Sequence, residues 1–310
     1  MPPPRRFLAL AVAALALLVA PGTAGAAIVN NGDFETGSLA GWQSSTTPDP
    51  NGSWAAYTGT ESPINAIPVP APPQGNFAAL TDQTGIGLRV LYQDVTLPPG
   101  GSVNQLSLLA YYVSSAAIVS PDSLDPSGGA NQQYRIDVMK PSAPLDSVAP
   151  GDVLLPVFRT LAGDPQTLDP TQKSADLTAL AGQTVRLRFA EVDNQLFFNA
   201  AADAISVKSN GFTIGQPVLN KKKGTARLPV TLPDQGGIKV SGKGVKNKAT
   251  LASKSVQVPG GPVTLVIKPK GKTKRKLNET GKAKVKVTIT YTPTGVSANA
   301  QKKKIKLKKT

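Results

Sequence analysis

The sequence predicts an all-β protein made of two consecutive sandwich domains. Its 310 residues include 29 glycines, 28 prolines and only 5% aromatic residues, a composition typical of short strands joined by turns. Several segments alternate apolar and polar residues, which is the period of a half-buried strand. The charge divides the chain, because residues 27–210 carry 8 basic and 17 acidic side chains, whereas residues 211–310 carry 24 basic and 2 acidic ones. We therefore expect two modules with different partners.

Residues 1–26 have the features of a secretory signal peptide. Arg5 and Arg6 precede an apolar run over residues 7–20, which a Pro-Gly breaker and small residues follow. The run is shorter than the roughly 20 residues needed to span a bilayer. We expect cleavage after Ala26 and a secreted protein that is associated with the cell envelope and has no membrane span. Both the general and the twin-arginine export routes stay open.

Residues 27–210 are predicted to form a β-sandwich or jelly roll. Strand-like segments recur at short spacing, and in residues 185–189 the apolar residues alternate with Arg, so that one face is buried. Two long irregular connections are expected at Thr46–Pro73 and Ser120–Asn131, and binding usually sits on such loops. The predicted strands cover residues 75–80, 88–97, 105–113, 133–139, 184–191 and 204–208.

Residues 211–310 are predicted to form a smaller, basic immunoglobulin-like sandwich. In Ala283–Tyr291 apolar residues take the odd positions and Lys or Thr the even ones. Seven short strands in this length match such a sandwich, whereas the alternative, a disordered basic tail, does not require strict alternation. The predicted strands are Phe212–Leu219, Thr225–Leu232, Ile238–Ser241, Ser253–Val258, Val263–Lys268, Ala283–Tyr291 and Lys303–Leu307.

The chain contains neither Cys nor His. Disulfides, thiol nucleophiles, histidine bases and the usual zinc sites are therefore excluded. A bound metal would be a hard cation held by oxygen ligands. No pair of carboxylates lies in a recognisable glycosidase motif, and no Ser has a His partner. We expect a protein that is not an enzyme, with a hydrolase as the remaining catalytic alternative.

The segments Asn31–Glu35 and Gly41–Trp42 resemble the opening of galactose-binding-like jelly rolls, similar to family 4/9/22-type carbohydrate-binding modules. Phe189–Glu191 and Ala202–Val207 resemble the end of that fold. The resemblance covers residues 27 to about 209 and implies that Ala27–Trp42 forms the first strand and a metal-holding corner, with Trp42 in the core.

In such modules a structural calcium ion joins the first and last strands. The matching positions here are the backbone carbonyl of Asp33 and the carboxylates of Glu35 and Asp203. Hard cations take about six to eight oxygen ligands. Ala204 replaces the second polar residue of the usual pair, which leaves one ligand open. The alternative is that Glu35 and Asp203 are ordinary exposed carboxylates.

The resemblance also implies a carbohydrate or cell-wall glycan as partner. Sugar binding uses aromatic platforms beside amide, carboxylate or Arg side chains. Tyr111 and Tyr112 are adjacent, so only one of them can face the concave side of a sheet. Phe197 and Phe198 are expected to cover the edge of the sandwich. The candidate ligand contacts are Trp54 and Tyr57 in the first long loop, Tyr111 or Tyr112, and Arg135 with Gln132 and Gln133.

The basic half resembles the lysine-rich C-terminal β-domains of exported actinobacterial proteins, on Lys221–Thr225 and Gly281–Val287. Its charge predicts association with anionic envelope polymers. Only Arg227 and Arg275 could form bidentate contacts with bases, so no specific nucleic acid partner is expected. The alternative is that Lys covers the wet faces of a thin sandwich and blocks edge pairing.

Together these observations predict noncatalytic binding at the cell envelope. The first domain would hold a glycan or other polar ligand near Trp54 and Tyr57, and the second would hold the protein near anionic polymers. The alternatives are a structural or adhesive spacer without a sugar site, and a hydrolase or hydrolase accessory.

Overall fold

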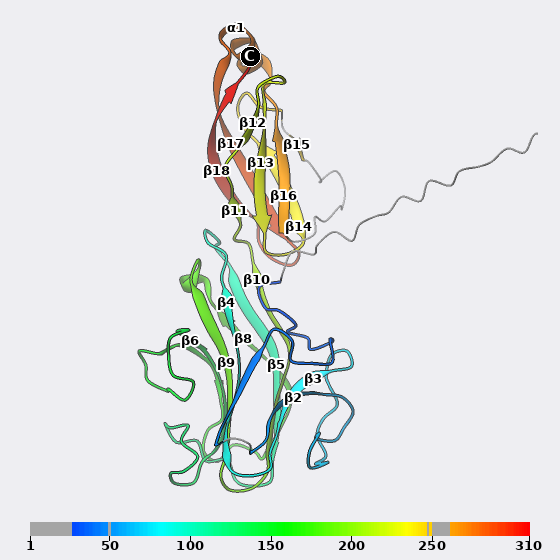
Figure 1. Cartoon of the computed structure of the whole chain (residues 1–310), viewed down its shortest axis with the longest axis vertical. Helices are drawn as coiled ribbons and strands as arrows, with labels where there is room; N and C mark the ends of the chain where they lie inside the picture. The colour runs from blue at the N-terminus through cyan, green and yellow to red at the C-terminus, as the bar shows by residue number, and fades with distance from the viewer. Residues whose placement is uncertain (1–26, 49–50, 247, 250–260) are drawn as a thin grey trace, which may run out of the picture.

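The computed structural model describes residues 27–48, 51–246, 248–249 and 261–310. It is 51% strand and 5% helix, which confirms the predicted all-β class. Two sandwiches follow one another along the long axis of the molecule (Figure 1). Each has a hydrophobic cluster of its own, one drawn from residues between Val29 and Val207 and the other from residues between Phe212 and Leu307. The predicted signal peptide lies outside the described residues.

Two five-stranded antiparallel sheets form the first sandwich. Their strand orders are β1-β4-β9-β6-β7 and β2-β3-β10-β5-β8. The strand β2 lies within the segment predicted as irregular, and β7 and β8 were not predicted because their residues lack a clear apolar alternation. The strands are β1 (Gln43–Thr47), β2 (Ser53–Tyr57), β3 (Ala78–Asp82), β4 (Gly87–Thr96), β5 (Asn104–Ser114), β6 (Gln132–Met139), β7 (Val153–Arg159), β8 (Thr167–Asp176), β9 (Thr184–Asp193) and β10 (Phe198–Ser209).

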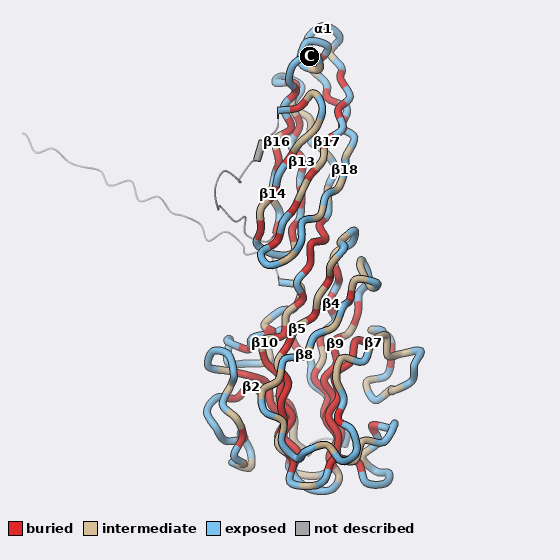
Figure 2. Tube along the Cα trace, turned by 180° about the vertical axis from the view of Figure 1, so that it is seen from behind, coloured by how far each residue is buried: buried red, intermediate tan, exposed pale blue. Residues whose placement is uncertain are grey.

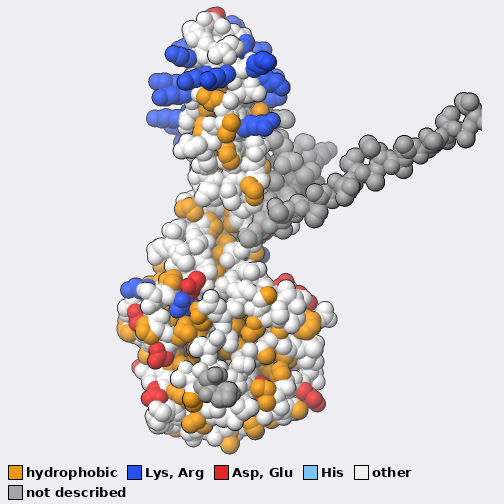
Figure 3. Space-filling model, in the orientation of Figure 1, with side chains coloured by type: hydrophobic (Ala, Val, Ile, Leu, Met, Phe, Trp, Pro, Cys, Tyr) orange, Lys and Arg blue, Asp and Glu red, His pale blue; other side chains and the backbone are white. Residues whose placement is uncertain are grey.

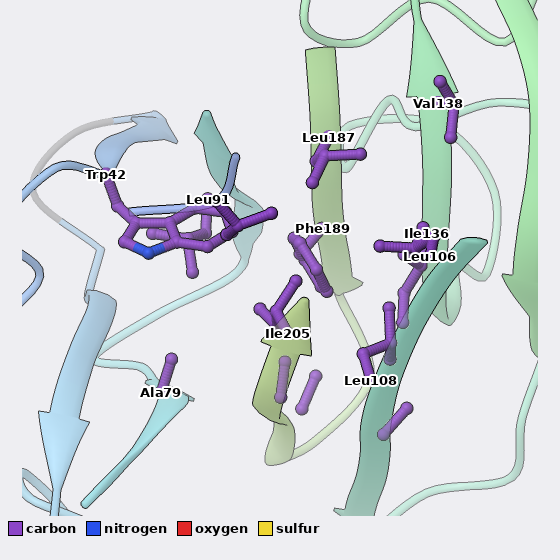
Figure 4. Packing of buried hydrophobic residues seen from close by; sticks show 14 of the residues in the cluster. Trp42, Ala79, Leu91, Leu106, Leu108, Ile136, Val138, Leu187, Phe189 and Ile205 are labelled. Atoms are coloured by element: carbon purple, nitrogen blue, oxygen red, sulfur yellow. The ribbon is translucent and has the colours of Figure 1, made fainter. Parts of the chain in front are cut away.

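Aliphatic and aromatic side chains fill the space between these two sheets (Figure 4). The rings of Trp42 and Trp54 both meet the ring of Phe189, at centroid distances of 5.7 and 6.4 Å. The indole of Trp42 donates to the Asn31 carbonyl at 3.0 Å, so its polar atom is paired as burial requires. The prediction that Trp42 belongs to the core is confirmed. In Figure 2 the buried residues, in red, lie along the strands of both sandwiches.

The opening segment, residues 28–42, consists of turns and bends, so the prediction of a first strand there is wrong. Asn31 and Phe34 have positive φ angles, which a strand does not allow. The carbonyl of Gly32 instead accepts a hydrogen bond from the amide of Ile205 at 2.8 Å. A Cβ on Gly32 would lie 2.0 Å from the carbonyl oxygen of Ile205, so a close backbone approach fixes glycine at this position.

The partner of the opening segment is a bulge in β10. The pairing of β10 with β5 shifts register between Asp203 and Ser206, and Ala204 has a φ of 52°. A bulge frees a backbone amide from the ladder and re-aims nearby side chains. The amide of Ile205 is freed in this way and holds the opening segment.

The second sandwich places one sheet, in which β13 pairs with β11, β12 and β16, against a sheet of order β15-β14-β17-β18. These two antiparallel sheets make residues 211–310 a second sandwich, and the finer prediction that it is immunoglobulin-like stays a prediction. The predicted strand Ser253–Val258 lies outside the described residues. The elements are β11 (Thr213–Ile214), β12 (Val218–Asn220), β13 (Thr225–Leu232), β14 (Gly236–Ser241), β15 (Lys248–Ala249), β16 (Gly261–Ile267), α1 (Gly271–Thr280), β17 (Lys282–Pro293) and β18 (Asn299–Lys308).

The helix α1 was not predicted from the sequence. Its only apolar residue, Leu277, is buried, and one apolar residue gives no helical periodicity to detect. The helix ends at Gly281, which adopts the left-handed conformation that closes many helices. α1 connects the two sheets of the second sandwich.

Amide side chains join the two domains. Asn299 donates to the carbonyls of Gly100 and Asn210 at 2.8 and 3.0 Å, and Asn210 donates to the Ser297 carbonyl at 3.1 Å. These bonds connect β18 and the loop before it to the loop after β4 and to the end of β10. The junction is therefore held by directional contacts as well as by the chain.

We predict that Gly32→Ala lowers the unfolding free energy of the first domain by about 1–3 kcal/mol, because the new Cβ collides with backbone that cannot move aside. Urea unfolding followed by tryptophan fluorescence reports on this domain, since both tryptophans, Trp42 and Trp54, lie in it. Gly129→Ala is the control, because a Cβ there meets nothing within 4 Å. Equal stability of the two variants would contradict the prediction.

Candidate functional site

The side chains predicted to contact a sugar are buried. Trp54 and Tyr57 lie on β2 and not in a loop, so the prediction of exposed loop platforms is wrong. None of the five offers an open ring face or a free polar edge to a ligand. Their exposed fractions are 3% for Trp54, 3% for Tyr57, 2% for Tyr112, 3% for Gln133 and 6% for Arg135.

The tyrosines are covered because neighbouring loops fold over the sheet. The hydroxyl of Tyr57 lies 2.6 Å from that of Tyr111 and donates to the Pro70 carbonyl at 2.6 Å. Burial raises the pKa of Tyr57 to about 12. Tyr112 points to the other face, where its hydroxyl donates to the Pro165 carbonyl at 2.8 Å. The loop before β3 is thus a cover over the second sheet.

Arg135 and Gln133 also hold structure in place. Arg135 forms a two-point ion pair with Asp137, and Asp137 accepts a further bond from Arg188 at 2.6 Å. Arg188 then donates to the carbonyls of Leu145 and Ser147, which fixes the loop after β6 on the outer face of the sheet. Gln133 donates to the Ser123 carbonyl at 2.7 Å and fixes the loop before β6 in the same way. These bonds hold both side chains against the protein, so neither is directed toward a ligand.

A pocket of about 300 Å³ lies at the end of the first sandwich that is far from the second domain, and we call it the apical pocket. It collects residues from the turns β3–β4 and β9–β10 and from the loop before β3. The side chains of Ile86, Leu196 and Phe197 at the pocket are 52%, 59% and 40% exposed, a dense group of exposed apolar residues. The lining is completed by Asn65, Gln83, Thr84, Gly85, Asp193 and Gln195.

Gln83 is the polar centre of the apical pocket. Its side chain is 3% exposed, and neither its amide oxygen nor its amide nitrogen has a hydrogen-bond partner among the described residues. Buried amides are almost always paired, and leaving one unpaired costs free energy. Both amide atoms are covered in this structure, so pairing with the hydroxyl groups of a ligand requires the Gln83 side chain to turn toward the pocket.

Buried ion pairs hold the residues that line the apical pocket in position. Arg89 pairs with Asp193 at 2.6 Å and with Glu191 at 3.1 Å, and Arg89 and Glu191 are fully buried. Burial raises the pKa of Asp193, although Arg89 opposes the shift. The Asp82 carboxylate accepts bonds from the amides of Ile64 and Asn65 and so positions the covering loop beside the pocket. The site is therefore prearranged by buried polar contacts.

Sequence reasoning did not find most of this pocket. It placed Phe197 and Phe198 together as an edge cover, but Phe198 is buried in the core while Phe197 is exposed at the pocket. The available signal was a pair of apolar residues, Leu196 and Phe197, directly after a turn-forming Asp-Asn-Gln stretch. Gln83 carries no sequence signal, because its burial arises only in the folded protein.

The three predicted calcium ligands lie near one another, but not all are exposed. Asp203 is fully buried, and its carboxylate accepts bonds from the amides of Gln74 and Ala204 at 3.0 and 2.6 Å. Glu35 is exposed and accepts bonds from the amides of Asn76 and Phe77. The same turn, residues 74–77, therefore bridges the two carboxylates by direct hydrogen bonds.

Electrostatics also connects these ligands. The pKa of Asp203 is raised to about 6, chiefly by burial and also by the nearby negative charges of Glu35 and Asp33, while hydrogen bonds from the amides of Ala204 and Gln74 oppose the shift. Among the described residues, no three His, Cys, Asp or Glu side chains form a metal-binding group. The predicted set of one carbonyl and two carboxylates offers the oxygen donors that a hard cation takes.

A second charged feature lies on the second domain, and we call it the lysine face. Figure 3 shows Lys and Arg gathered on this domain and Asp and Glu on the first. The exposed lysines of two paired strands stand directly opposite one another in three pairs, Lys282/Lys308, Lys284/Lys306 and Lys286/Lys304. The lysine face consists of Lys282, Lys284 and Lys286 of β17 and Lys302, Lys304, Lys306 and Lys308 of β18.

No protein-family model matches the chain, and no curated protein matches it. Among solved structures it is similar to TmCBM61 in complex with β-1,4-galactotriose, at 13% identity over 59% of this chain and 98% of that one, with a TM-score of 0.36. It is also similar to an adhesin domain of Lys-gingipain from Porphyromonas gingivalis, at 13% identity over 56% and 96% of the two chains, with a TM-score of 0.32. It is similar as well to a family 11 carbohydrate-binding module from Clostridium thermocellum, at 14% identity over 58% of this chain and 92% of that one, with a TM-score of 0.27.

The described residues include no helix that is both long enough and apolar enough to cross a membrane.

We predict that, with a chelator present, wild-type protein loses stability relative to Asp203→Asn as the pH rises from about 4 to about 7. The folded-state pKa of Asp203 is about 6, above its ordinary value of about 3.9, so the folded state binds the proton more tightly. The resulting stabilisation is complete below the unfolded-state pKa and is lost as the pH passes the folded-state value. Urea unfolding at several pH values measures the difference, and a difference independent of pH would contradict it.

Proposed function

We propose that the first domain binds a saccharide without catalysing its conversion, and that the apical pocket is the binding site. The observation that supports this most is the unpaired, buried amide of Gln83 beside the exposed side chains of Ile86, Leu196 and Phe197. A sugar ring presents apolar C–H faces and hydroxyl edges together. An aromatic or aliphatic surface with one well-placed amide is complementary to that combination.

The proposal places the protein outside the cell, at the envelope. The signal-like segment at residues 1–26 supports export, and the basic second domain supports association with anionic surface polymers by charge. In this arrangement the two binding surfaces lie on different domains, so the protein could link a glycan to a negatively charged surface. A purely adhesive or structural spacer is the second candidate, and the burial of Trp54, Tyr57 and Tyr112 favours it over a site on a sheet face.

The saccharide site is tested with Gln83→Leu and Phe197→Ala in the full chain. Removing an unpaired buried amide leaves stability unchanged or raises it by about 1 kcal/mol, while the hydroxyl contact to the ligand is lost. We expect either variant to weaken binding roughly tenfold or more, which corresponds to about 1.4 kcal/mol.

A glycan array identifies the saccharide, and calorimetry on the full chain measures its affinity. Val218→Ala is the control, since Val218 is exposed on the second domain and far in sequence from the pocket. Unchanged affinity in both pocket variants would contradict the site, and no binding to any saccharide would favour the spacer.

We also propose that calcium binds the carboxylates of Glu35 and Asp203 with the carbonyl of Asp33. Calcium there would neutralise the charges that act on Asp203. The Tm of the full chain at pH 7 should rise with calcium and fall with EGTA, because an ion that binds only the folded state stabilises it. Asp203→Asn should abolish the difference. Identical melting curves of the wild type in both conditions would rule out the calcium site.

A further inference from the structure

The lysine face carries repulsion that the protein itself does not relieve. Three lysines of β17 lie directly opposite three lysines of β18, and like charges in that position destabilise a sheet. Among the described residues every ion pair is formed by Arg, and none involves Lys. The second domain has only two acidic residues, Asp234 and Glu279. The charges of the face therefore lack a partner within the described chain.

Protection of a sheet edge does not by itself account for lysines that stand opposite one another. β18 is an edge strand, and lysines on an edge prevent pairing with other chains. β17 pairs with β18 from Lys282 to Tyr291 but with β14 only from Thr288 to Pro293. Charges of either sign would protect such an edge, so edge protection does not explain why Lys282, Lys284 and Lys286 face lysines and not acidic residues.

The spacing of the lysines fits one kind of polymer. Successive outward residues on a strand are about 7 Å apart, so each strand presents a row of positive charges with that repeat. An extended chain spans about 3.5 Å for each three backbone bonds, and a phosphodiester chain with roughly six bonds between phosphates therefore has about the same repeat of 7 Å. Successive phosphates of such a chain could therefore lie beside successive lysines of each row.

The composition of the face indicates how such a chain would be held. Thr288 and Thr290 continue the outward row of β17 beyond the lysines, and Lys239 of β14 lies opposite Thr290. These groups offer hydroxyl and ammonium donors but no aromatic ring for stacking and no Arg fork for bases. Recognition would depend on the backbone phosphates alone.

A groove at one end of the face extends the charged surface. It has a volume of about 570 Å³ and lies between α1 and the paired strands. Lys276 of α1 adds a fifth ammonium to those of Lys282, Lys284, Lys306 and Lys308, and Thr273 and Thr280 add hydroxyls. None of its lining residues is acidic.

We propose that the lysine face binds a linear phosphodiester chain with a repeat of about 7 Å, and that it does so through the phosphates. This inference rests on the proposed association of the second domain with anionic polymers and names the surface and the ligand chemistry. A polyol phosphate polymer and single-stranded nucleic acid share this chemistry. The absence of stacking groups on the face favours a chain without bases.

The test uses the full chain and a fluorescent oligomer of twenty propane-1,3-diol phosphate units, with binding followed by anisotropy. Seven lysines contacting phosphates predict a slope of log K against log salt of about −5. The variant Lys282→Gln/Lys284→Gln/Lys286→Gln should reduce that slope by about 2 and the affinity at 0.1 M salt about 100-fold. The same variant should have a higher Tm at low salt, since it removes the opposed charges.

The matched control is Lys221→Gln/Lys222→Gln/Lys223→Gln, which removes three exposed charges from the turn before β13. An equal loss of affinity in both triple variants would overturn the lysine face while leaving a general attraction to polyanions. No binding of the wild type to any anionic oligomer at 50 mM salt would instead remove the proposed association itself.

Two further oligomers test the chemistry. An oligomer with the same number of phosphates separated by hexaethylene glycol should bind at least tenfold more weakly, and equal affinity would overturn the match of spacing. A thymidine 20-mer should bind about as well as the propanediol oligomer. Much tighter binding of the thymidine oligomer would show that bases are recognised and would overturn recognition by the backbone alone.

Discussion

The docking of the opening segment on the bulge of β10 is the contact on which the first domain depends. β10 pairs with both β3 and β5 and leads directly into the second domain, so its bulge lies at the centre of one sheet. The bond between Gly32 and Ile205 sets the path of the segment that brings Phe34 and Trp42 into the core. A bulge in an otherwise regular ladder thus serves as the attachment point for a segment that cannot itself be a strand.

Buried polar contacts then decide which surfaces remain open. Arg188 and Gln133 fix two loops on the outer face of one sheet, and Tyr57 lies beneath a loop on the outer face of the other. Burying such groups is tolerated because most of their donors and acceptors are paired, with the Nε of Arg188 as an exception among the described residues. Since both faces are partly covered, the exposed apolar side chains gather at the apex of the sandwich.

The apical pocket and the lysine face have a common property. Each contains polar groups that find no favourable partner in the described protein. In the pocket this is the unpaired amide of Gln83, and on the lysine face it is the opposed ammonium groups of β17 and β18. Stability alone would favour an apolar residue at the first and neutral residues at the second. Local conflicts of this kind are expected where function outweighs stability.

The sequence alone determined the fold class, because alternation along Thr225–Leu232 and Ala283–Tyr291 depends only on which residues face the core. It also placed Trp42 in the core. It did not determine that Trp54 and Tyr57 are buried, that α1 exists, or that Gln83 and Phe197 meet at one pocket. Those facts depend on which loops cover which sheet face and on turns more than 100 residues apart meeting at one end of the sandwich. Exposure is a property of packing between distant segments, and no local pattern encodes it.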